Sequence, residues 1–132
     1  MATTPRKNGF TLIELLIAMV LIAILATIGV NRFWSVKDKG LVASVKNDIR
    51  TFASQQEDYF QRNYSYAAAS TDLTNFTPSS GVTITVTYNG IDGWSATGLH
   101  SSVPTFVCGY YTGNAPVQAP ATRNGVIACQ EP

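Results

Sequence analysis

A long apolar run lies close to the N-terminus of this chain and limits the folds that are open to it. Residues 10–30 contain only three polar side chains, those of Thr11, Glu14 and Thr27. A helix needs about 20 consecutive apolar residues to cross the hydrocarbon core of a bilayer. The sequence therefore predicts a membrane-spanning helix over residues 10–30, with one carboxylate near its start.

Glu14 is the only residue of this run whose charge is unfavourable inside a bilayer. A charge at the centre of a bilayer costs about 2.5–3.5 kcal/mol, and less near its edge. Two interpretations stay open: the carboxylate stays near the lipid headgroups, or it pairs with a cation. A buried carboxylate and a buried ammonium relieve each other's desolvation only when they are paired.

The helical pattern does not stop where the apolar run ends. Further apolar residues recur at helical spacing and form one stripe: Leu41, Val45, Ile49, Phe52 and Tyr59. We therefore predict a single helix over residues 10–62, which Asn63 ends. Its first half is apolar nearly all round, whereas its second half, within residues 31–63, needs a sheet or a helix against one face.

The second half of the chain predicts a small sheet. Residues 64–80 form a linker, and residues 82–88 alternate, with Val82, Ile84, Val86 and Tyr88 on one face. A turn at 89–93 leads to a return strand at 94–99. Residues 105–111 and 125–129 are the third and fourth strands, and residues 113–124 are an exposed loop. The predicted fold class is α+β: a long N-terminal helix whose second half packs on an antiparallel sheet.

The chain has two cysteines, Cys108 and Cys129. An even pair in a small, loop-rich domain after a membrane segment is typical of a disulfide outside the cytoplasm. Free thiols and half of a metal site are the alternatives, although no further ligand lies nearby in the sequence. Because basic residues lie on both sides of the apolar run, the cysteines decide the predicted orientation, with the C-terminal domain outside the cytoplasm.

No pattern typical of an enzyme is present. We find no nucleophile–base spacing, metal-ligand cluster or phosphate-binding loop, so we expect no catalytic residue, metal or cofactor. We interpret His100 as a surface loop residue, Glu57 and Asp58 as a solvated helix face, and Asp72 and Asp92 as turn residues. Residues 10–132 carry seven basic and eight acidic side chains, which predicts no general attraction for nucleic acid.

Residues 7–17, Lys-Asn-Gly-Phe-Thr-Leu-Ile-Glu-Leu-Leu-Ile, resemble the processing and assembly site of type IV pilins and pseudopilins. The shared features are a short basic leader, a glycine followed by phenylalanine, and a glutamate as fifth residue of the mature chain. The resemblance implies that a prepilin peptidase cuts between Gly9 and Phe10 and N-methylates Phe10. It also implies that Glu14 pairs with the amine of Phe10 in a neighbouring subunit during assembly.

The resemblance also implies a pilin-like organisation. Residues 1–9 are the leader peptide, 10–30 the transmembrane and filament-core helix, and 31–63 the amphipathic helix of the pilin domain. Residues 64–132 contain the linker, the antiparallel sheet and a C-terminal loop bounded by the disulfide.

The function implied is that of a structural subunit of a type IV pilus. Assembly machinery in the bacterial inner membrane would build a homo-oligomeric helical filament from it, and the filament would serve adhesion, twitching motility or DNA uptake. The precursor would lie in the inner membrane and the pilus outside the cell. A type II secretion pseudopilin shares the N-terminal motif and is the first alternative; a membrane-anchored binding module that never polymerises is the second.

Overall fold

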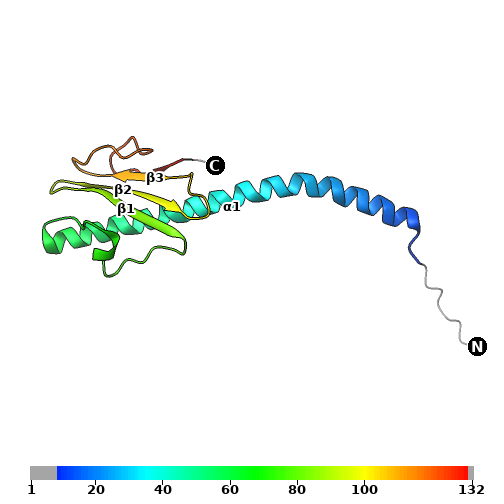
Figure 1. The fold of residues 1–132 in the computed structure, drawn as a ribbon, viewed down its shortest axis with the longest axis horizontal. Helices are drawn as coiled ribbons and strands as arrows, with labels where there is room; N and C mark the ends of the chain where they lie inside the picture. Colours follow the sequence, from blue (N-terminus) through cyan, green and yellow to red (C-terminus); the bar gives the residue numbers. More distant parts are fainter. Residues whose placement is uncertain (1–8, 131–132) are drawn as a thin grey trace, which may run out of the picture. The chain divides into compact units, whose positions relative to one another are not determined.

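The computed structural model describes residues 9–130 and shows a long helix followed by a four-stranded antiparallel sheet (Figure 1). In chain order the elements are α1 (Leu12–Asn63), η1 (Ser70–Asp72), β1 (Val82–Asn89), β2 (Trp94–His100), β3 (Cys108–Tyr111) and β4 (Ala128–Cys129). This confirms the predicted α+β fold. The chain divides into two units, residues 1–35 and 36–132, which are described separately. Leader residues 1–8 lie outside the described part.

The first unit contains the start of α1. Its large apolar side chains are exposed on every side of the helix between Leu12 and Val30. Among the described residues, α1 is the one helix that is long and apolar enough to cross a membrane, and none of its most apolar window is buried. A helix that is apolar all round needs lipid or other helices around it.

The second unit is built on one face of α1. Val42, Val45, Ile49 and Phe52 follow each other at helical spacing and are all buried. They belong to one core with the inward residues of the sheet, which include Val82, Ile84, Trp94, Ala96 and Cys108. Burial of each large apolar side chain stabilises the fold by about 1.5–3 kcal/mol. The predicted stripe is therefore confirmed, except that Val42 is buried where Leu41, which is half-buried, was expected.

A glycine lets the sheet approach the helix closely. A Cβ atom added to Gly98 of β2 would lie 2.8 Å from Cγ1 of Val45 and 2.9 Å from Cδ1 of Ile49. Both distances are too short for real carbon atoms, so a side chain here would push β2 away from α1.

The strands of the sheet follow the order β1-β2-β3-β4. The register of β1 against β2 shifts between Val86 and Tyr88. Val82 and Ile84 face the core as predicted, but Tyr88 is 42% exposed. The prediction that Tyr88 shares their face is wrong, because the irregularity interrupts the alternation of side chains.

Three other expectations for the C-terminal half need correction. The third and fourth strands are shorter than predicted and begin at Cys108 and Ala128. Residues 113–124 are not simply an exposed loop, because Ala115 and Ala121 are buried against Tyr111. His100 is not a surface loop residue: it is the buried last residue of β2.

Two buried polar side chains of α1 fix the linker that leads to the sheet. Gln56 accepts a hydrogen bond from the backbone N–H of Ala67 at 2.8 Å and donates one to its carbonyl oxygen at 3.1 Å. The Asp48 carboxylate accepts from the backbone N–H of Ser79 at 2.7 Å and from its hydroxyl at 3.0 Å. Both ends of the linker are therefore tied to the same helix.

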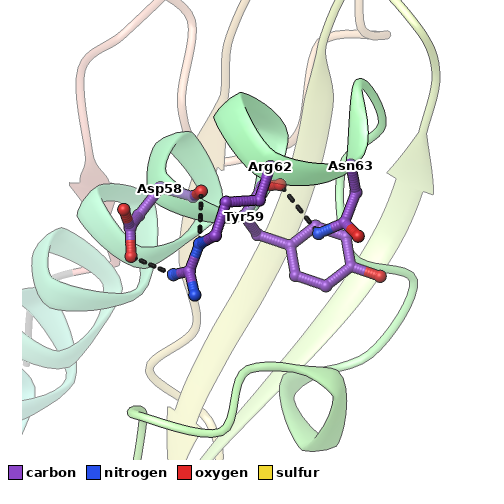
Figure 2. Close-up of polar contacts among 4 residues, drawn as sticks. All are labelled: Asp58, Tyr59, Arg62 and Asn63. Carbon is purple, nitrogen blue, oxygen red and sulfur yellow. Dashed lines mark hydrogen bonds and ion pairs between the residues drawn. The ribbon is translucent and has the colours of Figure 1, made fainter.

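Local contacts also end α1 (Figure 2). Arg62 forms an ion pair with the Asp58 carboxylate, and its Nε donates to the Asp58 carbonyl oxygen at 3.2 Å. Nδ2 of Asn63 donates to the Tyr59 carbonyl oxygen at 2.9 Å. These side chains bond to carbonyl oxygens near the end of α1, in addition to the backbone hydrogen bonds of the helix itself. Tyr64 then leaves the helix with a φ of 54°, in the left-handed region.

Candidate processing and assembly site

The predicted cleavage site lies in exposed, non-helical chain just before α1. Gly9 and Phe10 have no regular secondary structure, and the Phe10 side chain is 90% exposed. No atom lies within 4 Å of the position that a Cβ on Gly9 would take. A peptide bond in such a segment is accessible to a protease without prior unfolding of a helix.

Glu14 lies one turn further along, and its partner is Thr11. One carboxylate oxygen, Oε2, accepts hydrogen bonds from the backbone N–H of Thr11 at 2.9 Å and from its hydroxyl at 2.8 Å. The hydroxyl oxygen of Thr11 in turn accepts from the backbone N–H of Glu14 at 3.3 Å. Together these bonds form a capping box, which satisfies backbone groups at the start of the helix.

The role of Thr11 as a helix cap was not predicted from the sequence. Its signal was present, because a threonine followed three residues later by a glutamate before an apolar run is the pattern of a capping box.

The geometry of the capping box leaves one oxygen of the Glu14 carboxylate available as an acceptor. Within residues 9–130, Oε1 of Glu14 accepts no hydrogen bond and the carboxylate contacts no cationic side chain. The site can therefore take one more donor, and a cation is favoured over a neutral one.

The two cysteines form a disulfide in the second unit. Cys108 of β3 lies directly opposite Cys129 of β4 in the antiparallel register. The bridge therefore ties β4, which has only two residues, to the centre of the sheet. Because the cysteines are 21 residues apart, the bridge also closes the whole loop between these strands.

Three further polar side chains of the second unit, those of His100, Tyr66 and Tyr110, are buried or half-buried. Among residues 9–130, no three His, Cys, Asp or Glu side chains lie close enough to hold a metal ion. Nδ1 of His100 accepts a hydrogen bond from the backbone N–H of Ser102 at 3.1 Å. Burial raises the pKa of the Tyr110 hydroxyl. Burial and the nearby charge of Glu57 raise the pKa of Tyr66, which donates a hydrogen bond to Glu57 at 3.4 Å.

Comparisons with known proteins find similarity over part of the chain. Residues 4–30 match a family model described as the prokaryotic N-terminal methylation motif. The chain is 30% identical over 77 residues to the type IV major pilin protein PilA of Myxococcus xanthus, a match that covers 58% of this chain and 34% of PilA. It is 32% identical over 68 residues to type II secretion system core protein G of Pseudomonas aeruginosa, covering 52% of this chain and 48% of that protein.

In both cases the match spans less than half of the relative's own length. Both relatives are structural proteins of the pilin and pseudopilin kind. The matched motif includes Gly9, Phe10, Thr11 and Glu14, the residues around which the start of α1 is built. The chain therefore carries the prokaryotic N-terminal methylation motif and is homologous, over part of its length, to the pilin PilA and to the secretion protein G.

Proposed function

We propose that this protein is a structural subunit of a type IV pilus. In this proposal a prepilin peptidase removes residues 1–9, Phe10 becomes the N-methylated first residue, and the mature chains polymerise into a surface filament. The observation that carries the proposal is the environment of Glu14. Its carboxylate has one oxygen without a donor among residues 9–130, on an otherwise apolar helix surface.

Cleavage would create the positive charge that can pair with the Glu14 carboxylate. Hydrolysis between Gly9 and Phe10 creates an ammonium group on Phe10, at the end of the same apolar segment. When helices of several subunits pack together, the ammonium of one and the carboxylate of another can leave water or headgroups as a pair. A desolvated ion pair of this kind is tolerated, whereas a desolvated single charge is not. Processing and assembly would thus be coupled through one new charge.

The exposed apolar helix fits both states of such a subunit. Before assembly, residues 10–30 lie in the inner membrane; afterwards they form the core of the filament, with residues 31–63 and 64–132 as the outer pilin domain. Replacement of lipid contacts by helix contacts changes the hydrophobic energy little, because lipid tails are as apolar as leucine. Extraction therefore needs a separate machine, and assembly machinery in the inner membrane would supply it.

A type II secretion pseudopilin is the alternative that the match to core protein G favours. Two features support the pilus instead. Cys108 and Cys129 form a disulfide around the C-terminal loop. Residues 109–132 contain only one acid, Glu131, whereas major pseudopilins often hold a calcium ion in this loop. A melting temperature that rises on addition of calcium would favour the pseudopilin.

The test compares three variants, two at Glu14 and one at Thr11. Glu14→Ala removes the charge and the cap, whereas Glu14→Gln removes only the charge, because glutamine also forms capping boxes. Thr11→Val removes the hydroxyl and keeps the carboxylate. We expect both Glu14 variants to be cleaved normally but to lose filaments, and Thr11→Val to retain them. Mass spectrometry of sheared surface filaments would report the mature N-terminus, its methylation and the subunit's abundance. Normal filament yield from Glu14→Gln would refute the proposed pairing.

A further inference from the structure

One shallow pocket of the second unit has a basic rim that pairs with no acidic side chain among residues 9–130. This basic pocket, of about 310 Å³, lies between α1 and the C-terminal segment and is lined by Lys46, Arg50, Ala53, Tyr110 and residues 125–127. Lys46 and Arg50 lie one helical turn apart on an exposed face of α1. Positions three and four residues from either of them carry no acid. Two like charges at this spacing repel each other, so an external carboxylate would relieve both.

The turn between β1 and β2 has the complementary chemistry. This hairpin tip, residues 89–93, presents Ile91, which is 77% exposed, and next to it the exposed side chain of Asp92. No contact of the Asp92 carboxylate with a basic side chain occurs within the part of the chain that the structure describes. The tip thus combines one acid and one large apolar side chain, while the basic pocket combines two bases with the apolar side chains of Ala53, Val126 and Ile127.

The backbone holds the hairpin tip in one conformation. Gly90 donates to the Gly93 carbonyl oxygen at 2.8 Å, and Asn114 donates to the Asp92 carbonyl oxygen at 3.0 Å. A Cβ on Gly93 would lie 2.2 Å from the Thr112 carbonyl oxygen, so the tip is also packed closely against the neighbouring segment. A preorganised tip loses little conformational entropy when it binds.

We propose that the hairpin tip of one subunit docks in the basic pocket of a second copy of this chain. Asp92 would pair with Lys46 and Arg50, and Ile91 would cover the apolar floor of the pocket. This inference rests on the proposed function, because it assigns a contact between the pilin domains of a filament. The occupant is a second copy of this chain, because its hairpin tip carries both an acid and an apolar side chain that complement the pocket.

The positions of the two features suit an open chain of subunits. The tip joins β1 and β2, whereas the pocket lies beside Tyr110 of β3 and the residues that lead into β4, towards the other edge of the sheet. The tip and the C-terminal end of α1 lie at the same end of the second unit (Figure 1). Two different patches in contact make a heterologous interface, which repeats without closing unless the rotation happens to form a ring.

Charge exchange tests the pairing in filaments of the full chain. We expect Asp92→Lys and Arg50→Glu each to reduce the yield of sheared filaments by about fivefold or more, because like charges then meet. The double variant, Asp92→Lys with Arg50→Glu, should recover at least half of the wild-type yield. Thr85→Lys, which places the same lysine on an exposed position of β1, is the matched control and should retain the wild-type yield.

Cysteine cross-linking tests the geometry independently. Filaments of Asp92→Cys with Arg50→Cys should give a ladder of covalent oligomers on a non-reducing gel, and Thr85→Cys with Arg50→Cys should not. Wild-type yield from the Asp92→Lys variant, no recovery in the double variant, or equal ladders from both cysteine pairs would overturn the contact alone. A wild-type chain that is processed but forms no filament would refute the proposed function and this contact together.

Discussion

Gln56 allows the most direct test of how the pilin domain is held together. Its side chain is fully buried and bonds to both backbone groups of Ala67, which is buried as well. Replacement of Gln56 by leucine keeps a side chain of similar size but leaves the N–H and the carbonyl oxygen of Ala67 without partners. Each buried polar group left unsatisfied costs about 1–3 kcal/mol.

The expected decrease in the free energy of unfolding is smaller than the sum of these two costs. A buried leucine gains about 1.5–3 kcal/mol of transfer free energy that glutamine does not provide. We therefore expect Gln56→Leu to lower the free energy of unfolding by about 2 kcal/mol. For a domain of this size, that corresponds to a fall in melting temperature of about 10 °C. Gln61→Leu, on an exposed position of the same helix, should change the free energy by less than about 0.5 kcal/mol.

Gln56→Glu adds a pH dependence to the same test. A protonated glutamic acid can accept from the Ala67 N–H and donate to the Ala67 carbonyl oxygen, whereas the carboxylate can only accept. Burial and the hydrogen bond that the protonated carboxyl donates to the Ala67 carbonyl oxygen both raise the pKa of the new carboxyl in the folded state. The folded state then binds the proton more tightly than the unfolded state does. The variant should therefore match the wild type below about pH 4.3 and lose stability relative to it as the pH rises.

The assay is urea unfolding of the full chain in detergent micelles, followed by near-ultraviolet circular dichroism with the disulfide intact. Each variant is compared with the wild type at the same pH, so that contributions of other titrating groups cancel. Two results would refute the reasoning. One is a Gln56→Leu protein as stable as Gln61→Leu. The other is a Gln56→Glu protein whose difference from the wild type does not change between pH 4 and pH 8.

Three further changes can be measured by the same unfolding assay. Joint replacement of Cys108 and Cys129 by serine should lower stability by about 3 kcal/mol, and an unchanged midpoint would contradict the bridge. Gly98→Ala should cost about 1–3 kcal/mol, because the new methyl group would overlap Val45; a neutral effect would mean that β2 can move away. Tyr64→Gly should stabilise by about 1 kcal/mol, because Tyr64 is 80% exposed with a φ of 54°, and destabilisation would count against that strain.

Local sequence patterns were enough to predict the long helix, the main strands and the N-terminal motif. The apolar run of residues 10–30 and the stripe that contains Val45, Ile49 and Phe52 are periodic over many turns. Such repetition leaves one way to bury or expose the side chains, so pattern alone predicts the element. The hairpin between β1 and β2 followed equally, because strict alternation and a glycine-containing turn are both local signals.

The features that could not be predicted from the sequence depend on contacts between residues far apart in the chain. Asp48 and Gln56 look like ordinary surface residues of a helix, yet they are buried because residues 67 and 79 return over them. Tyr88 leaves the core because the pairing of β1 with β2 shifts by one register. His100 is buried, and Gly81, which lies far from it in sequence, packs closely against its ring. Burial of a polar side chain is set by a distant backbone partner, and local periodicity contains no information about that partner.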